Sequence, residues 1–222
     1  QQKNYYFCIV SPKLKILPLN EWIDTNGKPL VISGPCSAEN EEQILQTAHQ
    51  LAAIKQVNIF RAGIWKPRTR PGDFDGVGEI GLEWLKRVKK ETGLLTTVEV
   101  ADTSHVEKAL KHEVDILWIG ARTVVNPFSV QAIAEALTGV NIPIMVKNPV
   151  NPDIKLWLGA IERFNAIGIN KLIAIHRGFH YFEKSPFRNA PMWEIPIELK
   201  RIVPSLPIIV DPSHICGRQE LI

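Results

Sequence analysis

Short apolar runs rich in Val, Ile and Leu recur along the chain, separated by segments in which apolar residues follow the spacing of a helix. Each run is four to six residues long, which is the usual length of a buried strand. The predicted strands are residues 30–33, 57–60, 95–100, 116–119, 142–146, 172–175 and 207–210.

The segments between these runs predict amphipathic helices. Residues 40–55 present one apolar face, with Asn40 as the N-cap and Gln43 at the capping-box position. Asn151 followed by Pro152 predicts the start of another helix, because proline is favoured in the first helical position. The helix that begins there runs to residue 161, and the remaining predicted helices lie around residues 82–93, 106–110, 127–137 and 194–203.

Alternating helices and uniformly apolar strands indicate a parallel sheet covered by helices. Seven βα units without a linker favour a (β/α)8 TIM barrel over an open doubly wound sheet, although both folds share the alternation. We expect residues 1–29 to form an N-terminal arm, with a hairpin at 5–22 that caps the barrel, and residues 30–222 to form the catalytic barrel domain. A closed barrel needs eight strands. We therefore expect the eighth βα unit to be absent from this chain and the encoded protein to continue beyond Ile222.

Composition and charge narrow the classes of function. The 222 residues are 45% hydrophobic and 22% charged, as in an ordinary globular protein. A net charge of +3 does not indicate binding to nucleic acid or to a membrane. There is no apolar run of membrane-spanning length and no signal-peptide pattern at the start. Three scattered cysteines do not form a disulfide framework, so we expect a cytoplasmic protein with reduced thiols.

Positive charges gather where the predicted strands end. Residues 61–71 hold four cations and two prolines, which keep this segment out of a helix. In parallel α/β folds the C-terminal ends of the strands meet at one mouth. Cations that converge there would repel one another unless anions bind between them, so we predict a phosphate or carboxylate site rather than independent surface charges. The strand-end cations are Arg61, Lys66, Arg68, Arg122, Lys147 and Arg177.

Other strand-end residues suggest metal or covalent chemistry. Cys36 and His214 each follow an apolar strand and together suit a borderline divalent ion. Either residue alone is more often structural, and a metal site needs at least three protein donors; Cys216 is a weaker third candidate. Lys147 is compatible with a Schiff base as well as with simple anion binding.

Five short motifs resemble one enzyme family. They are Gly-Pro-Cys-Ser-Ala-Glu at 34–39, Lys-Pro-Arg-Thr at 66–69, Gly-Ala-Arg-Thr-Val-Val-Asn at 120–126, Arg-Gly-Phe at 177–179 and Asp-Pro-Ser-His at 211–214. Together they resemble the type I beta subgroup of the DAHP (3-deoxy-D-arabino-heptulosonate 7-phosphate) synthases. The resemblance covers residues 30–222. It implies a (β/α)8 barrel that condenses phosphoenolpyruvate with erythrose 4-phosphate and releases phosphate, the first step of the shikimate pathway to aromatic amino acids.

The same resemblance implies roles for individual residues. Cys36 and His214 match ligands of a divalent ion (Mn, Fe, Co or Zn), and the remaining ligands, a Glu and an Asp, would lie in the missing eighth unit. Arg68 and Thr69 match contacts to the aldose phosphate, and Lys66 is the candidate proton donor. The matches to phosphoenolpyruvate contacts are Arg61, Lys66, Arg122, Lys147 and Arg177.

Three alternative functions remain at this stage. The sibling 3-deoxy-manno-octulosonate 8-phosphate synthase typically carries a Lys-Ala-Asn-Arg-Ser loop, and the Lys-Pro-Arg-Thr at 66–69 argues against it. A Schiff-base aldolase would use Lys147, and a non-catalytic barrel would bind without turnover. The expected partners are phosphoenolpyruvate, erythrose 4-phosphate and further copies of the chain in a dimer or tetramer. A chorismate mutase beyond Ile222, fused or associated, is a further candidate.

Overall fold

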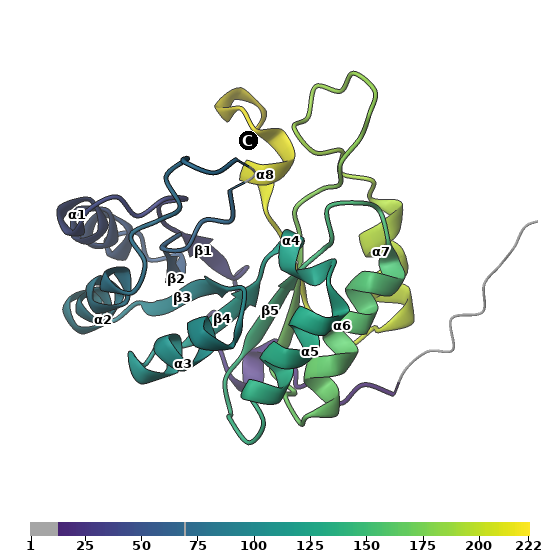
Figure 1. The fold of residues 1–222 in the computed structure, drawn as a ribbon, viewed down its shortest axis with the longest axis horizontal. Coiled ribbons are helices and arrows are strands. Elements are labelled where there is room, and N and C mark those ends of the chain that lie inside the picture. Colours follow the sequence, from purple (N-terminus) through teal and green to yellow (C-terminus); the bar gives the residue numbers. More distant parts are fainter. Residues whose placement is uncertain (1–12, 69) are drawn as a thin grey trace, which may run out of the picture.

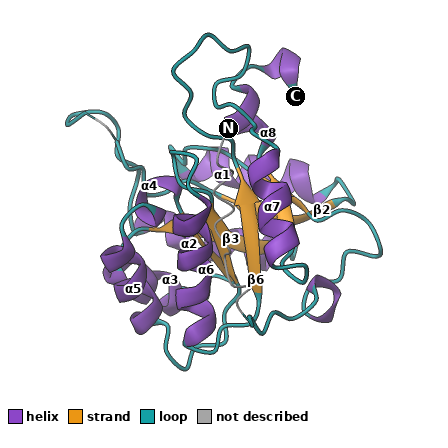
Figure 2. Ribbon diagram, turned by 90° about the vertical axis from the view of Figure 1, so that its right-hand side faces the viewer, coloured by secondary structure: helices purple, strands orange, loops and turns teal. Residues whose placement is uncertain are grey.

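A computed structural model describes residues 13–68 and 70–222. Its centre is a curled sheet in which every pair of neighbouring strands is parallel, and helices cover the outer face (Figures 1 and 2). The strands are β1 (Val31–Ser33), β2 (Val57–Arg61), β3 (Leu95–Val100), β4 (Ile116–Ile119), β5 (Ile144–Lys147), β6 (Leu172–His176) and β7 (Ile208–Val210).

In the described ranges, each strand is followed by one α-helix, except that two helices follow β4. The helices are α1 (Glu41–Ala52), α2 (Ile80–Thr92), α3 (Thr103–Lys111), α4 (Ala121–Val124), α5 (Pro127–Ala136), α6 (Ile154–Ala166), α7 (Glu194–Ile202) and α8 (Pro212–Cys216). In the described part of the chain, no helix is long and apolar enough to cross a membrane.

Strand order distinguishes the two folds that the sequence allowed. The sheet runs β1 to β7 in chain order, without the reversal that defines a doubly wound sheet. The prediction of barrel-type winding is therefore confirmed. Within the described residues β1 pairs only with β2, and β7 pairs only with β6, so the seven strands form an open, curled sheet.

Alternation along each strand separates two hydrophobic cores. Leu117, Ile144 and Val146 point outward and pack beneath the helices. Trp118 and Met145, on the opposite face of the same strands, belong to the inner cluster. Because side chains alternate between faces, the residues at the ends of the inward-facing rows point into the mouth of the curled sheet.

The N-terminal arm closes the opposite end of the sheet. Residues 13–22 contain a 3₁₀ turn, Leu19–Glu21, and hold no strand. Trp22 and Ile23 pack on the inner cluster, and the turn lies beneath the sheet in Figure 1. The other half of the predicted hairpin falls in residues 1–12, outside the described part, so the hairpin stays a prediction.

Local capping explains where helices begin. The Asn40 side chain accepts a hydrogen bond from the Gln43 backbone N–H, as predicted for α1. The predicted start of the helix at Asn151 and Pro152 is wrong. Helix α6 begins at Ile154, because the Asp153 carboxylate accepts hydrogen bonds from the N–H groups of residues 155 and 156.

Candidate active site at the C-terminal ends of the strands

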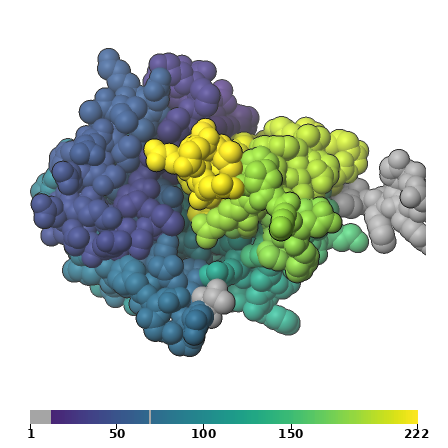
Figure 3. All heavy atoms as spheres, turned by 90° about the horizontal axis from the view of Figure 1, so that it is seen from above, coloured from purple at the N-terminus to yellow at the C-terminus, as the bar shows by residue number. Residues whose placement is uncertain are grey.

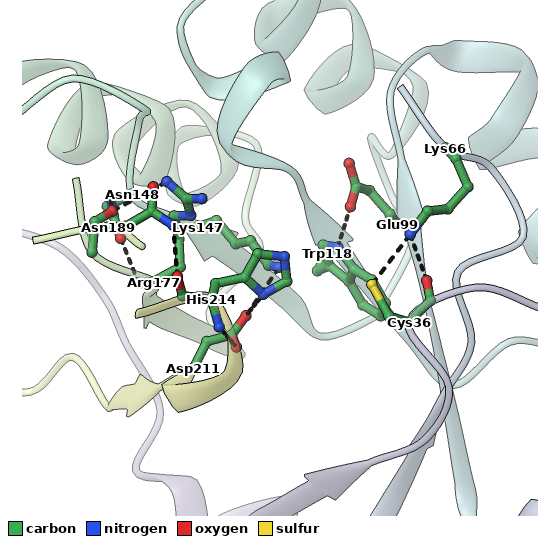
Figure 4. Close-up of polar contacts among 11 residues, drawn as sticks. Cys36, Lys66, Glu99, Trp118, Lys147, Asn148, Arg177, Asn189, Asp211 and His214 are labelled. Carbon is green, nitrogen blue, oxygen red and sulfur yellow. Dashed lines mark hydrogen bonds and ion pairs between the residues drawn. The ribbon is translucent and has the colours of Figure 1, made fainter. Parts of the chain in front are cut away.

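The ends of β1 and β2 are held together by two glycines. A Cβ on Gly34 would lie 2.0 Å from the Arg61 carbonyl oxygen, and one on Gly63 would lie 2.0 Å from the Cys36 carbonyl oxygen. Only residues without a Cβ allow these segments to approach so closely. This contact brings Cys36 beside Lys66, whose ammonium donates to the Cys36 carbonyl at 2.5 Å and to its Sγ at 3.3 Å (Figure 4).

The positive charges around Cys36 change its acidity. Partial burial raises the pKa of the Cys36 thiol, but the charges of Arg61 and Lys66 outweigh that effect and hold the pKa below its ordinary value. The larger fraction of thiolate makes this sulfur a better metal ligand or nucleophile than an ordinary cysteine.

On the opposite side of the mouth, three titratable groups meet at the ends of β5 and β7. Lys147 Nζ lies 3.3 Å from Asp211 Oδ2, and the same oxygen lies 2.7 Å from His214 Nδ1. The His214 ring points toward the side of the site that carries Cys36 (Figure 4).

The pKa values of this cluster follow from its charges. Burial raises the pKa of Asp211, but His214 and Lys147 together bring it well below its usual range. Asp211 raises the pKa of His214. Burial and the charges of Lys147 and Arg177 lower it by more, so the net pKa lies below the ordinary value. At neutral pH the imidazole is therefore largely neutral, with a lone pair available for a metal or a proton.

A carboxylate and an indole occupy the wall between these two groups. Glu99 and Trp118 are register partners on β3 and β4, and the Trp118 Nε1–H donates to Glu99 Oε2 at 2.9 Å. A Cβ on Gly120 would lie 2.1 Å from Glu99 Oε1, so the Gly of the Gly-Ala-Arg motif leaves room for this carboxylate. Lys147 Nζ lies over the Trp118 ring, 5.7 Å from its centroid.

Two arginines mark the far rim of the mouth. The Arg122 guanidinium donates to the carbonyl oxygen of Pro67 and so connects the end of β4 to the loop after β2. Arg177 is held through its backbone N–H, which donates to the buried Asn148 side chain at 2.7 Å. Burial lowers the pKa of Arg177, and the charges of Arg188 and Arg122 add to that effect, which Asp211 only partly opposes. The three guanidinium groups therefore lie close enough to interact electrostatically.

The loop after β2 is held by hydrogen bonds between its own residues. The Lys66 N–H donates to the Asp75 carbonyl at 2.7 Å, and Arg68 Nε donates to the Phe74 carbonyl at 2.6 Å. Arg68 is exposed and lies farther along this loop than Lys66. Thr69 lies outside the described residues.

The structure brings most of the predicted site residues to the same mouth. A cavity of about 160 Å³ is lined by Arg61, Trp118, Lys147 and Asp211 among others. A hollow of about 250 Å³ is lined in part by Lys66 and Glu99. Figure 3, which views the molecule from above, shows the C-terminal segment in yellow between the first βα units and the segment after β6.

Sequence reasoning missed several contributors to this mouth. Trp118 lies inside the apolar strand predicted at 116–119, and that pattern gives it no functional role. Glu99 and Asp211 are not among the predicted site residues, although Asp211 begins the Asp-Pro-Ser-His motif. Sequence reasoning also overlooked Arg188, which is far from any strand end in sequence and reaches the mouth because its loop is fastened to α8. That fastening includes the Asn189 side chain, which donates to the His214 carbonyl at 2.6 Å.

Comparison with known proteins assigns the family. The sequence matches the DAHP synthetase I family over residues 13–221. This chain belongs to the DAHP synthetase I family.

A curated protein and a crystal structure, both from Thermotoga maritima, are similar to most of this chain. A phospho-2-dehydro-3-deoxyheptonate aldolase of Thermotoga maritima is 34% identical over 211 residues, covering 95% of this chain and 60% of that protein. The crystal structure of a DAHP synthase from Thermotoga maritima superposes with a TM-score of 0.76 at 34% identity, covering 88% of this chain and 54% of that chain. The chain thus spans little more than half the length of these relatives.

A second set of similarities points to a sibling enzyme. A 2-dehydro-3-deoxyphosphooctonate aldolase of Syntrophotalea carbinolica is 38% identical over 102 residues, or 43% of this chain and 36% of that protein. This similarity covers less than half of the chain, whereas the heptonate aldolase matches nearly all of it.

The donor set at the mouth fits part of a metal site. A thiolate and a neutral imidazole oriented by a carboxylate are ligands that zinc and related divalent ions prefer. Among residues 13–68 and 70–222, however, no group of three His, Cys, Asp or Glu side chains is arranged to hold a metal. Cys36 and His214 therefore stay predicted ligands, and the described residues hold no group of three such donors around them.

Proposed function

We propose that this chain carries the active site of a DAHP synthase, which condenses phosphoenolpyruvate with erythrose 4-phosphate and releases inorganic phosphate. The observation that carries the proposal is the convergence of strand-end cations on one mouth in a member of the DAHP synthetase I family. These cations are Arg61, Lys66, Arg122, Lys147 and Arg177. Phosphoenolpyruvate offers a phosphate and a carboxylate, which suit such a set of partners.

In the proposed mechanism the cations first fix the reactants. Arg122, Lys147 and Arg177 hold the phosphate and carboxylate of phosphoenolpyruvate, and Arg68 and Thr69 hold the aldose phosphate. Positioning two anionic reactants in register supplies a large part of the barrier reduction. Arg122 supports this arrangement because its contact with the Pro67 carbonyl ties the phosphoenolpyruvate side to the aldose loop.

The bond changes follow from that arrangement. C3 of phosphoenolpyruvate attacks the aldehyde carbon of erythrose 4-phosphate and forms the new carbon–carbon bond. Lys66 donates a proton to the oxygen of the former aldehyde, a role that is worth about 10²–10⁴ in rate for a well-placed general acid. Water adds at C2, and the bond between C2 and the phosphate oxygen breaks to release phosphate and leave the keto group.

Cys36 and His214 would hold a divalent ion at this mouth. When bound, such an ion supplies Lewis-acid polarisation of the aldehyde. The lowered pKa values of the Cys36 thiol and the His214 imidazole increase the fraction of each side chain that is in its ligating form.

The sibling reaction is the second candidate, because its enzymes are similar to part of this chain. It would use arabinose 5-phosphate as the aldose. We favour erythrose 4-phosphate because the Lys-Pro-Arg-Thr loop at 66–69 stands where the sibling typically has Lys-Ala-Asn-Arg-Ser, and because similarity to the heptonate aldolase extends along 95% of the chain.

One assay distinguishes the two synthase reactions from each other, from a Schiff-base aldolase and from a non-catalytic barrel. Phosphate release and product formation are measured with phosphoenolpyruvate and either aldose phosphate, with manganese or zinc added and again after chelation. We expect turnover with erythrose 4-phosphate that falls on chelation. Preference for arabinose 5-phosphate would favour the sibling. Activity that survives chelation, with borohydride trapping on Lys147, would favour a Schiff-base aldolase. Binding of phosphoenolpyruvate without any turnover would favour a non-catalytic barrel.

A further inference from the structure

Trp118 stands between two opposite charges at the mouth. Its indole edge donates to Glu99 Oε2 at 2.9 Å, and its ring face lies beneath Lys147 Nζ at 5.7 Å. The side chain is only 5% exposed and packs with Met145 in the inner cluster, so the ring is fixed in place. Figure 4 shows Glu99 on the Lys66 side of the indole.

The Glu99 carboxylate is unusual in this position. A negative charge among cations that bind an anionic substrate competes for them. Glu99 nevertheless makes no ion pair with any side chain in the described ranges, and its hydrogen bond comes from the neutral indole. Lys147 pairs instead with Asp211, on the other side of the ring. The carboxylate is also confined by Gly120, whose missing Cβ leaves just the space that Oε1 fills.

We propose that Trp118 is a positioning residue that keeps the Glu99 carboxylate away from Lys147, so that the Lys147 ammonium remains available to the substrate anion. The indole does so in two ways. Its N–H holds the carboxylate at the ring edge, and its face stabilises the ammonium without neutralising it. The inference rests on the proposed function, since it concerns the affinity of the same mouth for phosphoenolpyruvate.

The first test is Trp118→Phe, which keeps an aromatic face but removes the N–H donor. The freed carboxylate can then reach toward the cations of the mouth and compete with substrate. Calorimetry should show phosphoenolpyruvate affinity reduced about tenfold, which is about 1.4 kcal/mol. The matched control is Trp157→Phe. Trp157 is also buried, but its indole donates to the Val146 carbonyl at 3.0 Å on the helix-covered side, so affinity should not change.

The decisive comparison removes the charge of Glu99. If Trp118 acts by restraining that charge, Glu99→Gln should cancel the defect: the double variant W118F/E99Q should bind phosphoenolpyruvate within about twofold of E99Q alone, as expected for two coupled residues. A merely structural role of Trp118 would leave the defect in the double variant.

A second route avoids any change in the core. Glu99→Asp shortens the side chain by one methylene, so its carboxylate no longer reaches the indole N–H while Trp118 stays in place. This variant should lose affinity to a similar extent as W118F, whereas Glu99→Gln should not. It provides the test if W118F does not fold.

The possible outcomes separate the inference from the proposed function. If the unaltered chain binds phosphoenolpyruvate but W118F and E99D bind it equally well, or if the W118F defect persists with E99Q, the role of Trp118 is refuted and the proposed function stands. If the unaltered chain binds phosphoenolpyruvate no better than Lys147→Ala does, the anion site itself is refuted, and the inference falls with it.

Discussion

Removing Lys147 should weaken phosphoenolpyruvate binding by about tenfold or more and leave the chain folded. Lys147 ends β5 with 11% of its side chain exposed, and its ammonium lies 3.3 Å from Asp211 and over the Trp118 ring. A hydrogen bond to a charged group contributes about 1.5–3 kcal/mol, which corresponds to about tenfold to 150-fold in Kd. Lys147→Ala also leaves the Asp211 carboxylate without its lysine partner, and that negative charge further opposes an incoming anion.

The fold should tolerate the same change. Breaking a fully buried ion pair costs about 3–5 kcal/mol. The cost here should be smaller because Asp211 keeps His214 at 2.7 Å. Adding Asp211→Asn should recover part of the lost stability in urea, but it should not restore the affinity of the unaltered chain, because the ammonium is still missing.

Isothermal titration calorimetry with phosphoenolpyruvate measures the affinity directly. Lys86→Ala is the matched control, since Lys86 pairs with Glu113 at 3.0 Å on the exposed surface and should leave the Kd unchanged. A Lys147→Ala chain that folds normally and binds as tightly as the unaltered chain would remove Lys147 from the substrate site and refute the reasoning.

Three further predictions test other parts of the account. Arg68→Ala should raise the KM for erythrose 4-phosphate and leave the KM for phosphoenolpyruvate nearly unchanged in steady-state assays; the reverse would mean that the cations are wrongly divided between the substrates. Gly120→Ala should lower stability in urea by about 1–3 kcal/mol, as overpacking does, because the new Cβ meets Glu99 Oε1; unchanged stability would show that the carboxylate moves freely. Burial lowers the pKa of His176 to about 4. Between pH 6.5 and 4 the unfolded chain therefore binds a proton at this residue that the folded chain does not. The free energy of unfolding should fall by up to about 3 kcal/mol over that range. His176→Phe should flatten this part of the pH profile, and an equally steep profile in that variant would assign the effect to other groups.

The sequence was sufficient to predict the strands and the residues at their ends. The uniformly apolar runs and the inner–outer alternation place Lys147 in the same inward row as Met145, so its position at the mouth follows from periodicity alone. The N-cap of α1 was equally readable, because Asn40 and Gln43 satisfy local backbone groups whatever the rest of the fold does.

Other features depended on contacts that no local pattern encodes. The pairing of Lys66 with Cys36 arises because Gly34 and Gly63 let two loops touch. The start of α6 was misread because both Asn151 and Asp153 are good N-caps, and only the folded backbone shows that Asp153 accepts the bonds.

The role of Trp118 was hidden for a related reason. An aromatic residue within an apolar strand carries no local sign that its N–H faces a carboxylate on the neighbouring strand. The register of β3 against β4 makes that contact, and register is a property of the assembled sheet.

A crystal structure of this chain with bound phosphoenolpyruvate would test the central claim most directly. The account predicts one molecule at the C-terminal mouth, with its phosphate and carboxylate contacting Arg122, Lys147 and Arg177 and with Glu99 still hydrogen-bonded to Trp118. Phosphoenolpyruvate bound elsewhere on the surface, or a mouth that stays empty at saturating ligand, would contradict it.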